Sequence, residues 1–223
     1  MRAVWSFVVA ENTRGGAVPQ MQVGMVECSK ESGQAMIIFD FETGGVSPEH
    51  PNIQLAAIAV DENWDEVDSF ESKIAFDPAR CDPEALKLNH YDAAAWANAP
   101  GEREVFGKFS AFLKKHSTFE CVSKRTGNPY KVARIAAYNA QFDKDRLWAM
   151  GAGQFIPAHP QAFCVMQLAM WVSYNGMIET ASMKLSDVAK AVLIPAKDAA
   201  HEALADVRMA AEVGKRLLQI ITK

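Results

Sequence analysis

The stretch Met36–Thr43, with the sequence MIIFDFET, decides the fold of this chain. Its first four residues form a continuous apolar run, which is typical of a central strand buried on both faces of a sheet. Asp40 and Glu42 follow at the end of that run. Because side chains alternate between the two faces of a strand, we expect Asp40 and Glu42 to project together while Phe41 points into the opposite core.

Asp40 and Glu42 are candidate ligands for a divalent cation. Two carboxylates on the same face of a buried strand repel each other unless a cation lies between them. Oxygen ligands of this kind suit Mg²⁺ or Mn²⁺. The alternative is that the pair merely ends a strand at the surface, which is the commoner situation for a lone pair, because charged residues mostly occupy exposed positions. The metal-site interpretation therefore depends on acidic residues elsewhere in the chain.

The rest of the chain predicts strands and helices in an order that defines the fold class. Strands are expected at 53–60, 66–76 and 132–138, and helices from 83, at 102–116, 141–150, 183–193 and 202–221. Residues 163–171 fit either a short strand or a helix, and 117–131 is expected to be an exposed basic loop around Lys124, Arg125 and Lys131. Three strands followed by strands that alternate with helices predict an α/β domain with a mixed sheet.

Residues 1–35 alternate short apolar runs with turn-rich segments. We interpret them as an N-terminal extension of unknown role, ahead of a single domain at 36–223. No apolar run approaches the roughly 20 residues needed to span a bilayer. The four cysteines include no Cys-x-x-Cys pair, which fits neither a zinc site nor a disulfide framework. We therefore expect a cytoplasmic protein without a membrane partner.

The net charge of −4 bears on whether the chain can handle nucleic acid, because phosphate binding usually requires a basic face. The sequence has 27 Asp plus Glu against 23 Lys plus Arg. The excess of four acids equals the number of candidate site carboxylates in the chain, which are Asp40, Glu42, Asp143 and Asp206. Cations bound by those four would leave the remainder balanced. The charge is therefore compatible with nucleic-acid binding and argues against a long, salt-driven DNA footprint.

A second polar cluster follows the strand expected at 132–138. Asn139 closes that strand, and Asp143 falls early in the next helix, where its carboxylate can return over the strand end. The alternative is local, since Asn and Asp near a helix start are ordinary capping residues. Phe142 is expected in the core in either case.

The third cluster contains His201 and Asp206, which are five residues apart. On a continuous helix they would be separated by about 140° and would point in different directions. We therefore expect His201 on a loop before the last helix and Asp206 on that helix, facing the other carboxylates. A lone histidine is more often a solvated or packed residue than a catalyst, although its near-neutral pKa leaves a catalytic role open.

Taken together, the clusters Asp40-x-Glu42, Asn139 to Asp143 and His201 to Asp206 resemble the three motifs of the DEDD exonucleases in their histidine subtype. That family includes the proofreading subunit of the bacterial replicative polymerase, ribonuclease T and oligoribonuclease. The resemblance runs from about residue 36 to the last helix. It implies an α/β, ribonuclease H-like fold with a mixed, mostly five-stranded sheet flanked by helices.

The resemblance also implies a catalytic apparatus with two Mg²⁺ or Mn²⁺ ions. It assigns metal binding to Asp40, Glu42 and Asp206, with Asp143 holding metal-bound water, and the role of general base to His201. This arrangement is chemically coherent, because two ions roughly 3.5 to 4 Å apart supply an attacking hydroxide and stabilise the leaving oxygen. An imidazole near neutrality can accept the proton of the water.

Weaker similarities suggest substrate contacts. The segment 83–90 resembles the part of the family that contacts the terminal nucleotide, with Glu84 and His90 as candidates. The candidate contacts are completed by Thr43, Gly44 and Asn139. The chain also departs from the family pattern, because Gly44-Gly45 replaces a threonine before the glycine, Tyr138 replaces a common histidine and Cys164 replaces a common aspartate. These departures leave the catalytic groups in place and affect the expected substrate preference.

The expected activity is hydrolysis of phosphodiester bonds from single-stranded 3′ ends, releasing 5′-mononucleotides, with DNA favoured over RNA. The expected partners are single-stranded DNA or RNA 3′ ends, and a polymerase or another replication or repair protein is a further candidate partner. Three alternatives remain open at this point. They are an RNA-trimming exoribonuclease, a nucleic-acid-binding module that keeps the fold without cleaving, and a ribonuclease H-like endonuclease.

Overall fold

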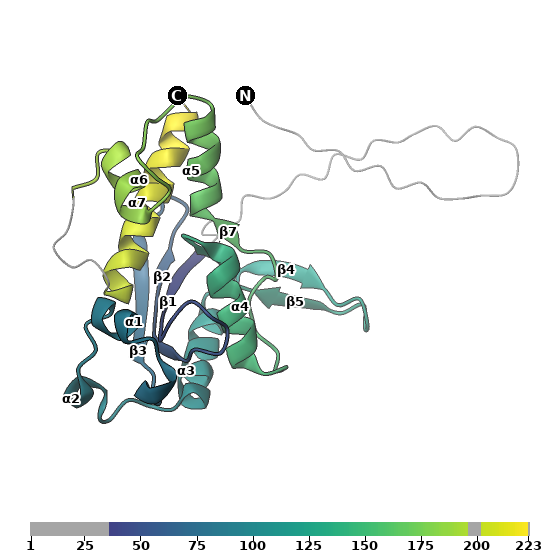
Figure 1. The fold of residues 1–223 in the computed structure, drawn as a ribbon. Helices are drawn as coiled ribbons and strands as arrows, with labels where there is room; N and C mark the ends of the chain where they lie inside the picture. The colour runs from purple at the N-terminus through teal and green to yellow at the C-terminus, as the bar shows by residue number, and fades with distance from the viewer. Residues whose placement is uncertain (1–35, 196–201, 223) are drawn as a thin grey trace, which may run out of the picture. The chain divides into compact units, whose positions relative to one another are not determined.

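The computed structural model describes residues 36–195 and 202–222. The predicted N-terminal extension at 1–35 and the candidate base His201 lie outside these residues. The described residues form one main sheet, a separate two-stranded sheet and a set of helices (Figure 1).

The main sheet has five strands in the order β3-β2-β1-β6-β7. They are β1 (Met36–Thr43), β2 (Asn52–Val60), β3 (Glu66–Lys73), β6 (Arg134–Ala137) and β7 (Phe163–Cys164). The first three form an antiparallel meander, whereas β6 runs parallel to β1 and β7 runs parallel to β6. The predicted mixed five-stranded sheet is thus confirmed, with β1 at its centre.

Helices flank this sheet. They are the 3₁₀ turn η1 (Pro78–Arg80), α1 (Pro83–Leu88), α2 (Ala93–Trp96), α3 (Glu102–Lys115), α4 (Ala140–Gly151), α5 (Val165–Tyr174), α6 (Leu185–Ala191) and α7 (Ala203–Ile221). Across the described part of the chain, no helix combines the length and the apolar character that a membrane span requires.

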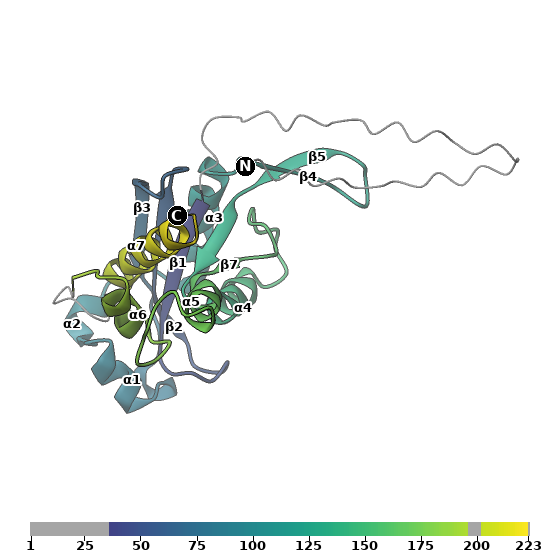
Figure 2. The same cartoon turned by 90° about the horizontal axis from the view of Figure 1, so that it is seen from above.

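Strand alternation divides the core between the two faces of the sheet. Phe39 and Phe41 are buried on one face with Phe109 of α3 and with apolar residues of α4. Ile38 is buried on the other face with Val207 and other small residues of α7. Helix α7 therefore lies along β1 and β2 (Figures 1 and 2), on the face to which the even-numbered residues of β1 point.

Strand β1 is longer than its apolar run predicts. The apolar run ends at Phe39, and pairing with β2 continues through Asp40 and Glu42 to Thr43. The long antiparallel partner β2 supplies backbone hydrogen bonds beyond the apolar residues. Asp40 and Glu42 consequently have strand geometry and share a face, as predicted.

The prediction of a loop at 117–131 is wrong for 119–122 and 129–131, which are strands. Residues Phe119–Val122 (β4) and Pro129–Val132 (β5) form an antiparallel hairpin, which projects from the main sheet (Figure 2). The turn closes at Gly127, which has a φ of 73°, a conformation that glycine adopts without a steric penalty. Only the tip, with Lys124 and Arg125, remains an exposed basic turn.

The segment 163–171, which was expected to be either a short strand or a helix, contains both. Phe163 and Cys164 form the short edge strand β7 against β6, and helix α5 begins directly at Val165. The buried positions Val165, Ala169 and Val172 have helical spacing. The apolar residues belong first to a strand and then to a helix. Neither the strand period nor the helix period therefore extends through the whole segment.

Candidate active site

Three candidate carboxylates come from two elements that pack against each other. Asp40 and Glu42 lie on the face of β1 that meets α7, and Asp206 lies in the first turn of α7. Ala203, three residues before Asp206, is fully buried against that face. Because residues three apart share a helix face, this packing directs Asp206 towards β1.

The electrostatics of Asp40 and Glu42 show that the three carboxylates are neighbours. Burial, followed by the negative charge of Asp206, raises the pKa of Asp40 to about 7. Burial, followed by the charges of Asp40 and Asp206, raises the pKa of Glu42 to about 8. Carboxylates that raise one another's pKa values in this way favour either protons or a cation between them.

Asp143 joins the cluster from α4. Its side chain is 2% exposed, and its Oδ1 accepts a hydrogen bond of 3.1 Å from the backbone N–H of Phe41. The pairing of β1 with β6 covers Met36 to Ile38, so Phe41 lies beyond the end of its parallel neighbour. Asp143 therefore takes the place of a strand partner on this edge of β1.

The charge of Asp143 also interacts with the other acids. Its pKa is raised well above the ordinary value, mainly by burial and then by Asp40, although the Phe41 N–H opposes the shift. Asn139 occupies the N-cap position of α4 without a side-chain capping bond and is exposed. Local helix capping thus does not account for Asn139, and Asp143 hydrogen-bonds to a strand that is distant in sequence.

The donor set fits a hard divalent cation. Oxygen atoms from several carboxylates are the ligands that Mg²⁺ and Mn²⁺ prefer, and a cation would relieve the repulsion that raises these pKa values. Among the described residues, no three His, Cys, Asp or Glu side chains are already gathered into a complete metal site.

The predicted substrate-contact segment lies next to the end of β1. The Asn89 side chain donates a 3.0 Å hydrogen bond to the carbonyl of Thr43. The backbone N–H of Asp82 donates a 2.7 Å bond to the carbonyl of Gly44. Glu84 and His90 are exposed on the same segment. The structure thus brings Thr43 and Gly44 together with the residues that flank α1.

Gly44 is closely surrounded at this junction. A Cβ atom at position 44 would lie 2.4 Å from Sγ of Cys81, so no side chain fits without displacement. The Thr43 hydroxyl donates to the carbonyl of Gly45 at 2.8 Å. Gly44 and Gly45, where the chain departs from the family pattern, therefore lie in a tight backbone turn.

Tyr138 and Cys164 have structural contacts beside the candidate site. The Tyr138 hydroxyl donates a 2.7 Å hydrogen bond to the carbonyl of Met183, and the Cys164 thiol donates to the carbonyl of Tyr138 at 3.3 Å. Burial raises the pKa of Tyr138, so the phenol stays a protonated donor. These two residues link the end of β6 to β7 and to the segment before α6.

Sequence reasoning missed Asn89 and Arg146. Arg146 is 7% exposed. Its guanidinium donates hydrogen bonds to the carbonyls of Gly45, Ser47 and His50 at 3.2, 2.8 and 2.6 Å. Arg146 thereby fixes the loop that follows Gly44. The sequence around an arginine in the middle of a helix does not predict such contacts, because the loop is about a hundred residues earlier in the chain.

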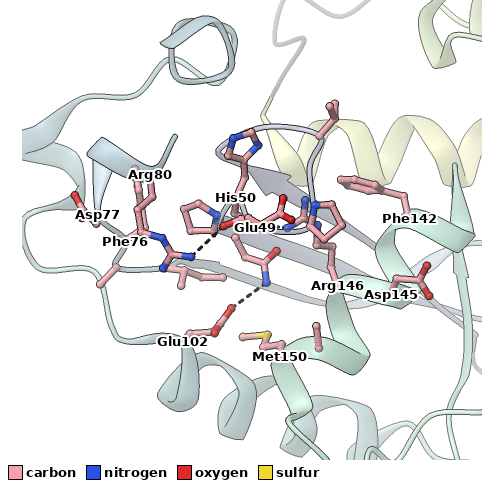
Figure 3. Close-up of a pocket in the computed structure, with 17 residues that line it drawn as sticks. Glu49, His50, Phe76, Asp77, Arg80, Glu102, Phe142, Asp145, Arg146 and Met150 are labelled. Atoms are coloured by element: carbon pink, nitrogen blue, oxygen red, sulfur yellow. Dashed lines mark hydrogen bonds between the residues drawn. The ribbon is translucent and has the colours of Figure 1, made fainter. Parts of the chain in front are cut away.

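A cleft of about 440 Å³ lies on the α4 side of this loop (Figure 3). Its lining comes from the loop at 46–52, the segment 74–80 and helix α4. None of the four candidate carboxylates lines it. Phe142 borders this cleft and is half-buried beneath the Arg146 guanidinium, so its predicted place in the core is wrong. The cleft is thus separate from the carboxylate cluster.

Comparison with known proteins finds one family model that matches the first part of the domain. Residues 37–126 match the RNase_T family, which is described as exonuclease. This segment includes Asp40 and Glu42 and ends before the later two clusters. No curated protein matches the sequence.

Several solved structures share the fold. E. coli exonuclease I in complex with a dA16 oligonucleotide matches with a TM-score of 0.61 and 18% identity, over 83% of this chain and 41% of that one. Cell-death related nuclease 4 (CRN-4) matches with a TM-score of 0.65 and 16% identity, over 83% and 64% of the two chains. A 3′-exonuclease that recognises the histone mRNA stem-loop matches with a TM-score of 0.63 and 14% identity, over 84% and 64%.

These comparisons confirm the predicted ribonuclease H-like fold and the predicted resemblance to the DEDD exonucleases. The chain spans less than half the length of exonuclease I and less than two thirds of the other two proteins. The histidine subtype stays a prediction, because His201 lies outside the described residues.

Proposed function

We propose that this chain is a DEDD-type, metal-dependent 3′–5′ exonuclease that removes 5′-mononucleotides from single-stranded 3′ ends. The observation that carries this proposal is the convergence of Asp40 and Glu42 from β1 with Asp206 from α7, with Asp143 buried against the same strand. A strand and two helices would thus hold the reacting phosphate in a fixed frame.

The proposed division of labour assigns metal binding to Asp40, Glu42, Asp143 and Asp206. Two bound Mg²⁺ or Mn²⁺ ions would supply an activated water and stabilise negative charge on the phosphate oxygens. His201 would accept the proton of the attacking water on a ring nitrogen. The bond from phosphorus to the 3′ oxygen of the preceding nucleotide would break, and that oxygen would leave with a proton.

The junction between β1 and α1 would position the terminal nucleotide. Thr43 ends the strand that carries two acids, Gly44 follows it, and the hydrogen bond from Asn89 holds that end against α1. Glu84, His90 and Asn139 are exposed and would contact the sugar or base. A substrate held on this junction would present its last phosphate to the carboxylates.

DNA is the favoured substrate, and an RNA-trimming activity is the alternative. One similar protein binds a dA16 oligonucleotide and another recognises a histone mRNA stem-loop, so the fold accepts both chemistries. Discrimination would rest on contacts to the 2′-OH near Thr43 and Glu84. A polymerase or another replication or repair protein remains a candidate partner.

A degradation assay tests the proposed activity. Oligonucleotides labelled at the 5′ end, in matched DNA and RNA sequences, should shorten one nucleotide at a time with Mg²⁺ or Mn²⁺ and stay intact with EDTA. Asp40→Asn and His201→Ala should each lose at least about a hundredfold in rate, as expected for a catalytic group. Glu62→Gln, which removes an acid from an exposed turn, should keep full activity.

Two further substrates separate the alternatives. A closed circular single strand should resist the enzyme, and its cleavage would instead identify an endonuclease. Metal binding by calorimetry without degradation of any DNA or RNA end would identify a non-cleaving module. Equal rates in Asp40→Asn and the unchanged protein would refute the assigned site.

A further inference from the structure

The β4–β5 hairpin combines exposed cations with exposed aromatic rings. Lys124 and Arg125 lie at its tip, and neither forms an ion pair with any residue that the structure describes. Tyr130 of β5 is 40% exposed, and Phe155 beside it is 69% exposed. The two rings meet edge to face with centroids 6.2 Å apart.

Two hollows join these groups into one surface. A hollow of about 640 Å³ extends from Lys124 and Arg125 to Tyr130 and Phe155. A second hollow of about 270 Å³ shares Tyr130 and Phe155 and reaches Trp148 of α4, which is 37% exposed. A continuous path of cations and rings thus leads from the hairpin tip to α4.

Helix α4 connects this surface to the candidate active site. Asp143 lies in the first turn of the helix, and Phe155 follows four residues after its end. Its 12 residues correspond to a length of about 18 Å. Lys144 and Trp148 are four residues apart and share one face of α4, so they lie between the two ends.

The acids near this path are few. Glu120 of β4 is 3.5 Å from Lys131 of β5, so these two charges are paired. Asp145 accepts hydrogen bonds from Gln141 on the exposed face of α4. Lys124, Arg125 and Lys144 therefore leave the path with a positive balance, which complements a phosphate backbone.

We propose that the β4–β5 hairpin, with Phe155 and Trp148, forms a second contact surface for single-stranded nucleic acid. This surface binds the part of the strand that lies several nucleotides away from the hydrolysed end. Cations that follow the backbone, together with rings on which bases stack, are the features with which proteins hold single strands without reading their sequence. The proposal deepens the proposed exonuclease function, because it makes substrate length a determinant of affinity.

Binding measured without catalysis tests this surface. The probes are labelled oligo(dT) and oligo(U), each in a form too short to reach from the carboxylates to the hairpin and in a long form. Fluorescence anisotropy is recorded with EDTA present, so that no turnover is required. The unchanged protein should bind the long oligonucleotides at least about fivefold more tightly than the short ones, which corresponds to one stacked base.

Two double variants probe the two components of the surface. Lys124→Ala with Arg125→Ala should weaken binding of the long probe and reduce the slope of log affinity against log salt by about 1.4, as expected for two lost phosphate contacts on a single strand. Tyr130→Ala with Phe155→Ala should weaken it by at least about fivefold with little change in that slope. Binding of the short probe should stay unchanged in both variants.

Matched controls remove the same groups from other faces. Lys190→Ala with Arg216→Ala removes two exposed cations from α6 and α7, and Tyr174→Ala removes an exposed ring from α5. These controls should bind the long probe normally. Circular dichroism identifies any variant that fails to fold. If the Tyr130→Ala, Phe155→Ala variant fails to fold, the Lys124→Ala, Arg125→Ala variant at the exposed tip still decides the test.

The outcomes separate this proposal from the proposed activity. Long-probe affinity that depends on the hairpin supports the second surface even if the protein releases no nucleotide. Unchanged long-probe affinity in both hairpin variants refutes the surface even if the protein is an active exonuclease. Variants that alter the oligomeric state but not probe binding would assign the hairpin to contacts between copies of the chain, which also refutes the proposal.

Discussion

Asp143 accepts a structural hydrogen bond and also carries a candidate catalytic charge. Two substitutions distinguish these two roles. Asp143→Asn keeps an oxygen for the Phe41 N–H but removes the charge, so we expect a large loss of activity without a loss of stability. Asp143→Ala leaves that buried N–H without its acceptor, which costs about 1–3 kcal/mol. Urea denaturation and the degradation assay, applied to both variants, measure the two effects.

The comparison of the two Asp143 variants is itself the control. If Asp143→Asn were as unstable as Asp143→Ala, the carboxylate charge and not its hydrogen bond would hold β1 to α4. If Asp143→Asn retained full activity, Asp143 would be a structural residue and the four-acid site would be refuted.

Residue positions were predictable where a local period determines them. Strand alternation places Asp40 and Glu42 on one face and Phe41 on the other, and the structure confirms this. The bond from Phe41 to Asp143 was not predictable in detail, because it depends on where β6 stops pairing with β1. Arg146 was missed for the same physical reason, since its acceptors are carbonyl groups in a distant loop.

At the scale of elements, two glycines within helices offer a test of how α7 packs. Gly214 of α7 would bring an added Cβ to 2.3 Å from the Trp64 ring, whereas an added Cβ on Gly107 of α3 meets nothing within 4 Å. Both replacements by alanine gain helix propensity, worth about 0.8–1.0 kcal/mol. We expect Gly107→Ala to stabilise the protein and Gly214→Ala to destabilise it by about 1–3 kcal/mol through overpacking.

Thermal denaturation of both glycine variants measures the difference. Because α7 carries Asp206, displacement of this helix should also lower nuclease activity in Gly214→Ala but not in Gly107→Ala. Equal stabilisation by the two substitutions would show that Trp64 moves aside without cost and that α7 is not held at this point.

Elements were predictable where apolar periodicity continues for several turns. Helix α3 and the long helix α7 follow their stripes closely. The hairpin at 119–132 was missed, because its basic residues indicate exposure and its strands lie outside the main sheet. The exposed tip was predicted, while backbone pairing between two short strands left too weak a pattern in the sequence.

At the scale of the whole molecule, the clustered carboxylates connect metal binding to stability. The pKa values of Asp40 and Glu42 are raised to about 7 and about 8 in the folded protein, whereas an unfolded chain releases these protons near pH 4. Between about pH 4 and pH 8 the unfolded state therefore binds fewer protons than the metal-free native state. The free energy of unfolding must fall as the pH rises through that window.

Asp40→Asn tests this linkage, because an amide cannot ionise and relieves the repulsion on Glu42. In EDTA at pH 8 we expect this variant to melt at least about 2–4 °C higher than the unchanged protein, the shift that 1 kcal/mol gives in a domain of this size. Near pH 4 the two melting temperatures should converge, and Glu62→Gln should show no such pH-dependent gain. Mg²⁺ or Mn²⁺ at pH 8 should then raise the melting temperature of the unchanged protein, since a ligand that binds the native state stabilises it, but should have little effect on Asp40→Asn. A constant difference between the two proteins from pH 4 to pH 8 would mean that Asp40 and Glu42 do not share a site with Asp206, and the proposed metal centre would fail with it.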